Sequence, residues 1–200
     1  PTMSMATPTT TMMPYDTTNS DAYPYITSDG RARVRVEASI PLGEIQGMVS
    51  IAATVAKITG QQPMMLSDEE ARTSFNVSFC SLGGATIKSK QVIDSQDNTY
   101  FKFDSDSNII DLQDSSKIYA IDAKYDYCIL IKVHPRLFPN RVHICVAGIG
   151  TWGTHGGSWY LANKWDELQE KFGDQDFGAV IRVEHELIES AELIDSKQKV

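Results

Sequence analysis

The sequence lacks a long apolar run and has fewer basic than acidic residues. No stretch of about 18 apolar residues occurs, so no membrane-spanning helix is predicted. Eighteen Lys and Arg stand against 26 Asp and Glu, a net charge of −8, whereas binding to a nucleic-acid backbone needs a basic surface. The first residues also lack the charged start and apolar stretch of a secretory signal. We therefore expect a cytoplasmic protein that binds neither membranes nor nucleic acid.

Common metal-site and phosphate-site motifs are missing as well. The three cysteines form no C-x-x-C pair, and their odd number argues against a disulfide framework. The four histidines form no H-E-x-x-H pair, and the Asp104–Asp111 segment lacks the glycine and glutamate of a calcium loop. No lysine follows the glycine groups as in a P-loop. We expect no metal site, and the sequence identifies no cofactor.

The first 25 residues differ in composition from the rest of the chain. They hold four of the eight prolines, four of the seven methionines and seven threonines, with no strand or helix period. Such a segment has too few large apolar residues to form a core. We expect residues 1–28 to be a disordered tether and residues 29–200 to form a single domain. The tether also suggests a fragment of a longer protein with further domains as partners.

The remaining pattern alternates between strand and helix signals. A period-two strand is expected over 31–40 and a helix from Pro41 to Gly60. The runs 125–134 and 141–148 read as strands joined by only six residues, so they should pair antiparallel if they are neighbours. An amphipathic helix over 158–172 and a strand over 178–183 follow, and residues 184–194 are either a short helix or a strand. The order predicts an α/β fold, a Rossmann-like three-layer domain with a mixed, partly antiparallel sheet.

A glycine-rich loop lies between an apolar strand and that amphipathic helix. Gly148, Gly150 and Gly153 have the spacing G-x-G-x-x-G, which in dinucleotide-binding folds lets backbone approach a pyrophosphate at a helix N-terminus. The acidic residue expected about 20 positions later is missing, because Glu184 comes about 31 residues after Gly153, and Trp152 is bulky for such a loop. A ligand-binding edge remains the favoured interpretation. The alternative is a structural turn in which glycines allow close helix–sheet packing.

A second strand–glycine–helix junction supports the ligand interpretation. Ser81, Gly83 and Gly84 follow an apolar strand, and ligands of α/β sheets collect at the carboxyl ends of strands. Together the two junctions predict a pocket for a nucleotide-like small molecule. Its expected ligand-binding residues are Ser81, Gly83, Gly84, Gly148, Gly150, Thr151, Gly153 and Thr154.

Two other functions stay open on the sequence alone. The first is an enzyme that cleaves an N-glycosidic bond, with Glu184 or Asp126 as the catalytic carboxylate and His155 assisting in proton transfer. The second is a protein-interaction domain without a ligand, in which Trp152 and Trp159 are exposed anchors. Whether the chain is an enzyme is therefore uncertain from the sequence.

Three stretches resemble a known group of domains: "SLGG" (81–84), "YDYCILI" (125–131) and "CVAGIGTWGTHGG" (145–157). They are similar to a poorly characterised group of Rossmann-like domains attached to bacterial multidomain signalling and defence proteins. In that group the glycine-glycine turn is often followed by proline and then asparagine, whereas Ala85 and Lys88 stand nearby here. The resemblance implies an α/β fold more than a function, and it brings no established reaction.

Overall fold

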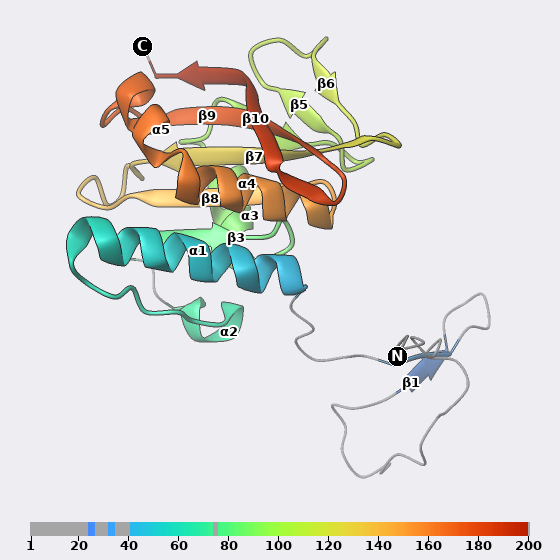
Figure 1. Ribbon diagram of the computed structural model, residues 1–200, viewed down its shortest axis with the longest axis horizontal. Coiled ribbons are helices and arrows are strands. Elements are labelled where there is room, and N and C mark those ends of the chain that lie inside the picture. Colours follow the sequence, from blue (N-terminus) through green and yellow to red (C-terminus); the bar gives the residue numbers. More distant parts are fainter. Residues whose placement is uncertain (1–23, 27–31, 35–40, 74–75, 200) are drawn as a thin grey trace. The chain divides into compact units, whose positions relative to one another are not determined.

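The computed structural model describes residues 24–26, 32–34, 41–73 and 76–199 (Figure 1). The chain divides into two units, residues 1–40 and 41–200. In the first, β1 (Pro24–Ile26) pairs antiparallel with β2 (Ala32–Val34). Most of the expected tether and the remainder of the expected strand 31–40 lie outside the described residues.

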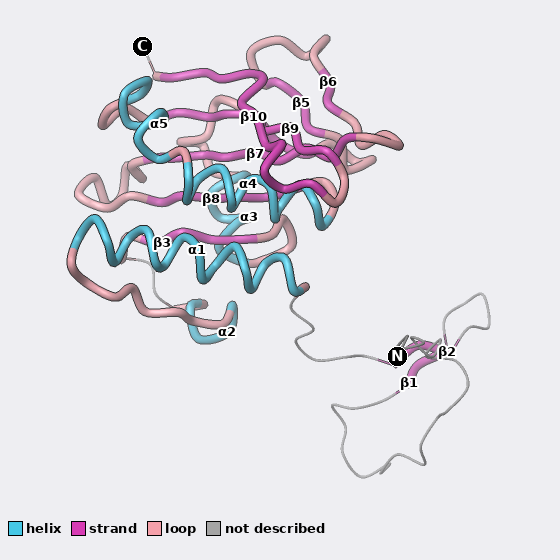
Figure 2. Tube along the Cα trace, viewed as in Figure 1, coloured by secondary structure: helices cyan, strands magenta, loops and turns pink. Residues whose placement is uncertain are grey.

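The second unit is built on a five-stranded sheet with the order β10-β9-β7-β8-β3 (Figure 2). Only β3 and β8 are parallel, and the other neighbours are antiparallel. The fold is thus a mixed α/β fold, as the sequence predicts. The strands are β3 (Phe79–Leu82), β7 (Tyr125–Val133), β8 (His143–Gly148), β9 (Phe177–Glu184) and β10 (Leu187–Gln198).

The centre of the sheet consists of apolar strands buried on both faces. Successive residues of β7 alternate between two cores, with Cys128 and Leu130 in one and Ile129 and Ile131 in the other. The predicted antiparallel pairing of β7 with β8 is confirmed, since the short connection between them allows a reversal but no parallel crossover.

Three helices belong to the first core. These are α1 (Leu42–Thr59), α4 (Thr151–Asn163) and α5 (Trp165–Phe172). Helix α4 packs directly on the sheet, and α1 packs on α4 (Figure 1). The predicted end of α1 is confirmed, because Gly60 takes the left-handed conformation (φ 71°) that commonly follows the last helical turn.

The opposite face of the sheet carries the second core. Helix α3 (Ile87–Ile93) contributes Val92 and Ile93, and a three-stranded sheet contributes Phe101 and Ile109. The strands of that small antiparallel sheet are β4 (Phe101–Phe103), β5 (Ile109–Asp111) and β6 (Ile118–Tyr119). The four-residue helix α2 (Asp68–Ala71) precedes β3 and begins with a capping box between Ser67 and Glu70.

The secondary structure differs from the prediction at the glycine-rich segment before 158. It also shows which of the two predicted alternatives, helix or strand, holds near the end of the chain. Residues expected to form a glycine loop are helical, since α4 begins at Thr151 and includes Gly153, Gly156 and Gly157. Close packing on the sheet outweighs the low helix propensity of glycine here. Residues 187–198 form strand β10 rather than a helix. Within the described ranges, no helix is both long and apolar enough to cross a membrane.

Candidate functional site

The two glycine junctions lie side by side at the carboxyl ends of β3 and β8. The Gly83 N–H donates a 2.9 Å hydrogen bond to the Val146 carbonyl. A methyl group placed on Gly84 would lie 3.8 Å from the Gly148 carbonyl oxygen. After these parallel neighbours the chain continues into α3 on one face and α4 on the other. Such a divergence is a topological switch point, the usual ligand position in α/β sheets.

The N-terminus of α4 is capped by the carboxylate of Asp126 on β7. Its Oδ2 accepts a 2.7 Å hydrogen bond from the Gly153 N–H, and its Oδ1 accepts from Gly150 (3.1 Å) and from Tyr127 (2.7 Å). Asp126 is fully buried. Its charge is stabilised by these amides and by the positive end of the helix dipole. The carboxylate therefore holds amides that a ligand phosphate would otherwise bind.

A second carboxylate caps α3 in the same way. The Ile87 N–H donates to both oxygens of Asp68, at 2.9 and 3.0 Å. The Thr86 side chain accepts a further hydrogen bond, from the Ser89 N–H at 3.2 Å. At both junctions, protein carboxylates thus take the place at the start of the helix that an anion could fill.

Three hydroxyl groups hold the turn between β3 and α3. Ser81 Oγ lies 2.9 Å from Thr86 Oγ1 and 2.8 Å from Ser89 Oγ. Ser81 and Ser89 are buried, so the network satisfies polar groups that would be costly to leave unpaired. Ser81, which the sequence predicts to bind a ligand, therefore has a structural role at this turn.

Two side chains that the sequence did not single out cover the Gly83-Gly84 turn. A methyl group on Gly83 would lie 2.8 Å from Glu44 Oε1, and one on Gly84 would lie 3.5 Å from the Phe103 ring. Burial raises the pKa of the Glu44 carboxyl. Glu44 lies in the first turn of helix α1, far from Gly83 in the sequence. No sequence pattern therefore indicates this contact.

The other expected ligand residues lie along the first turns of α4. The buried Thr154 hydroxyl accepts a 3.0 Å hydrogen bond from the Gly148 N–H and so closes the corner between strand and helix. Thr151, the first helical residue, is exposed. His155 is buried against Gly43 of α1 and stacks with Trp152 at 6.2 Å between ring centroids, and desolvation lowers its pKa.

The three expected catalytic residues do not converge on one point. Asp126 pairs with Val183 across the sheet, so Glu184 points to the opposite face. Glu184 instead forms an ion pair with Lys124 at 3.5 Å. His155 lies between α4 and α1. Cleavage of an N-glycosidic bond stays a prediction that this arrangement does not favour.

The glycines of α4 also bring the helix close to the sheet. A methyl group on Gly157 would collide with Cys128 Sγ, and one on Gly153 would collide with the Tyr127 carbonyl oxygen. One on Gly156 would lie 2.7 Å from Val183. These contacts are those of a structural corner.

The expected anchors Trp152 and Trp159 are half-buried against the first core.

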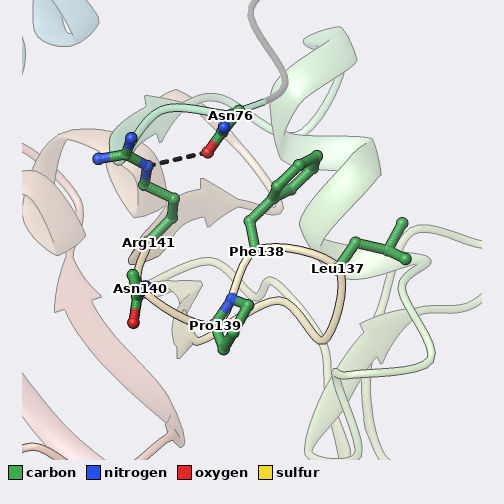
Figure 3. Close-up of a pocket in the computed structure, with 6 residues that line it drawn as sticks. All are labelled: Asn76, Leu137, Phe138, Pro139, Asn140 and Arg141. Carbon is green, nitrogen blue, oxygen red and sulfur yellow. Dashed lines mark hydrogen bonds between the residues drawn. The ribbon is translucent and has the colours of Figure 1, made fainter.

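Two hollows of the surface lie away from the junctions. One, about 480 Å³, is lined by residues 137–141 and Asn76, and Figure 3 shows Arg141 Nε donating to Asn76 Oδ1, a 3.0 Å hydrogen bond. The other, about 400 Å³, lies between α5 and β10. Neither is lined by an expected site residue.

Among residues whose placement is described, no group of three His, Cys, Asp or Glu side chains could hold a metal ion. The chain matches no protein-family model, no curated protein and no solved structure.

Proposed function

We propose that the domain is a regulatory or effector module of Rossmann-like type that binds a nucleotide-like ligand where β3 and β8 end. The observation that carries the proposal is the switch point between these parallel strands, at which the Gly83-Gly84 turn and Gly148 are neighbours. Ligands of α/β domains bind at this place because the diverging connections leave backbone accessible there. The resemblance to Rossmann-like domains of signalling and defence proteins supports the same function.

The carboxylates at the junctions specify which part of the ligand would be recognised there. Asp126 and Asp68 hold amides at the two helix starts, so phosphate is not the group received at these positions. Glu44 supplies acceptor oxygens beside Gly83, and carboxylates in comparable sites accept hydrogen bonds from ribose hydroxyls. The ribose and base would therefore contact the junctions, with phosphates directed toward solvent.

A thermal-shift screen tests the proposal. The purified chain is heated with nucleosides, nucleotides, dinucleotides, cyclic nucleotides and nucleotide sugars, and a ligand of the folded state raises Tm. We expect at least one hit, with the nucleoside retaining most of the shift. Glu44→Gln should weaken that hit at least tenfold, whereas Glu69→Gln, at an exposed acid of α2, should leave it unchanged. No hit, or an equal shift in Glu44→Gln, contradicts the proposal. Product analysis of the hit separates a sensor from an enzyme.

A protein-interaction role is a second candidate, favoured by the distribution of exposed apolar residues. Of the fourteen large apolar side chains that are exposed in the described part of the chain, eight fall between Leu42 and Leu66. They belong to α1 and the segment that follows it, and α1 lies beside α4 on one face of the sheet (Figure 1). Concentrated apolar surface of this kind marks contact sites for other proteins.

A further inference from the structure

An imidazole and a carboxylate form a close pair at the end of the central strand β7. The ring Nδ1 of His134 lies 2.6 Å from Oδ1 of Asp176, and the same oxygen accepts a 2.9 Å hydrogen bond from the His134 backbone N–H. Lys132, two residues earlier, pairs with Phe177 of β9, so the pair lies where β7 ends and β9 begins. Because β7 is antiparallel to β8, this is the end of the sheet opposite the glycine junctions.

The carboxylate of Asp176 is fixed by contacts with the ends of two other strands. It is buried and is held to the end of β7 by the two contacts with His134. Just after β10, the Lys199 N–H donates a 3.0 Å hydrogen bond to the Asp176 carbonyl, and Lys199 Nζ lies 3.9 Å from Asp176 Oδ2. A carboxylate fixed in this way orients the imidazole and keeps its proton on Nδ1. The lone pair of the neutral ring is then on Nε2.

The Nε2 atom of His134 is accessible, in contrast to the other histidines. The His134 side chain is 33% exposed, and its Nε2 is neither buried nor hydrogen-bonded to any described residue. The Nε2 atoms of His143 and His185 are buried, and His155 is buried as a whole. Of the four histidines, His134 thus combines a carboxylate on Nδ1 with an accessible Nε2.

We propose that Nε2 of His134 is a phosphoryl-acceptor site for a donor of the phosphoramidate class, with Asp176 as its positioning residue. In the transfer, the Nε2 lone pair forms the new N–P bond while the P–N bond of the donor breaks. That electron pair leaves with the amine, which departs as ammonia when the donor is N-protonated phosphoramidate. The Nδ1 proton stays on the ring, and the charge of Asp176 offsets the positive charge that the ring gains.

The surroundings of His134 favour transfer to the surface over catalysis in a pocket. Neither of the two hollows described above is lined by His134, whereas small substrates are normally bound in concave sites. An acceptor needs only an accessible nitrogen, because the donor arrives from solution. The side chains of Arg136 and Lys199 are largely exposed, and such cations pair well with phosphoryl oxygens. A charge added at this surface is a form of regulation.

Phosphoramidate itself is the probe that tests the proposal. The full 200-residue chain is incubated with potassium phosphoramidate at neutral pH, and intact mass and peptide mapping without acid locate the product. We expect a gain of about 80 Da, one phosphoryl group, on His134. It should form several times faster than on any histidine of the urea-unfolded chain, because unfolding removes the Asp176 contact. His134→Gln should abolish the gain. His185→Gln, at a histidine whose Nε2 is buried, is the matched control and should react like the unaltered chain.

The ring nitrogen that reacts tests the part played by Asp176. Nitrogen-15 NMR of histidine-labelled chain distinguishes the two products, and we expect the Nε2 product alone. Asp176→Ala releases Nδ1 and should give both products. Asp176→Asn keeps an acceptor oxygen, so it should keep the Nε2 selectivity but react more slowly, because the negative charge is lost. Circular dichroism verifies folding, and Asp176→Asn decides if Asp176→Ala does not fold.

The outcomes that overturn the proposal are distinct from those of the ligand screen. No gain in mass, a gain on another histidine, or a His134 that reacts no faster than in urea overturns the acceptor site. An Nδ1 product in the unaltered chain overturns it too, since Asp176 would then not hold Nδ1 in solution. Unchanged selectivity in folded Asp176→Ala, or an unchanged rate in Asp176→Asn, overturns the role of this carboxylate. The inference does not rest on the ligand proposal, and His134→Gln should give the same ligand screen as the unaltered chain.

Discussion

The carboxylate of Asp126 accepts a 2.7 Å hydrogen bond from the backbone N–H of Gly153 in the first turn of α4. It is fully buried and has two further amide donors, so all of its protein partners at this corner come from the backbone. The interaction ties the central strand β7 to the helix that covers it. It also gives the amides of the glycine-rich strand-to-helix connection an acceptor from within the protein.

Asp126→Ala should reduce the free energy of unfolding by about 2–4 kcal/mol. Loss of a helix cap costs about 1 kcal/mol, and leaving buried amides without an acceptor adds a comparable or larger penalty. Asp126→Asn keeps one acceptor oxygen and should lose less. Urea unfolding followed by circular dichroism measures both. Asp106→Ala, at an exposed acid in the turn between β4 and β5, is the control and should change stability by less than about 0.5 kcal/mol. A similar small change for Asp126→Ala would show that the cap is dispensable.

Two glycine-to-alanine substitutions should differ sharply in their effect on stability. A methyl group on Gly157 would collide with the buried Cys128 Sγ, whereas one on Gly84 would make an ordinary 3.5 Å contact with Phe103. We expect Gly157→Ala to cost about 1–3 kcal/mol, as overpacking of a core does, and Gly84→Ala to be nearly neutral. Thermal and urea unfolding of both variants decide the matter. Equal stability of the two would mean that α4 moves away from the sheet at little cost.

The small sheet is attached to β10 through Asp195. Its Oδ2 accepts hydrogen bonds from Tyr119 Oη at 2.7 Å and from Lys117 Nζ at 3.0 Å. Tyr119→Phe removes one of these bonds and should cost about 0.5–1.5 kcal/mol. Amide hydrogen exchange should quicken in β5 and β6 while the centre of β7 keeps its protection. Uniform acceleration across the domain would mean that the small sheet opens only with the rest.

Local sequence patterns predict those elements whose structure depends on residues close to one another in the chain. The apolar runs 125–133 and 143–148 with their short connection predict an antiparallel pair, and Pro41 and Gly60 bracket α1. The glycine segment reads as a loop because its G-x-G-x-x-G spacing between a strand and a helix matches a ligand-binding turn. Its helical state depends on close contacts with Cys128 and Val183, which belong to other strands and have no local signature.

The sequence also predicts that the two glycine junctions share one site, because ligands of α/β sheets bind at the carboxyl ends of the strands. What the sequence could not indicate was which groups fill that edge. Asp126 is 27 residues from Gly153, and Asp68 is 19 residues from Ile87. The sequence names Asp126 only as a candidate catalytic carboxylate, and no pattern indicates that either acid caps a helix, because neither lies near its partner in the chain. For the same reason, the position of Glu44 over Gly83 had no signal in the spacing of residues.

Acid should destabilise the domain in part through His155. Desolvation lowers the pKa of this side chain below its ordinary value of 6.5, while Glu189 acts in the opposite direction. As the pH falls through about 6.5, the unfolded chain takes up a proton that the folded chain resists. The free energy of unfolding therefore falls as the pH drops below about 7, by at most about 1.4 kcal/mol per pH unit for one proton. Urea titrations across this range should show a shallower fall in His155→Gln. Part of the fall should remain, because burial also lowers the pKa of His143.

In Glu189→Gln the pKa of His155 drops further, so the fall in the free energy of unfolding should extend to lower pH. Parallel profiles for the unaltered chain and His155→Gln would mean that this imidazole is as easily protonated in the folded state as in the unfolded one.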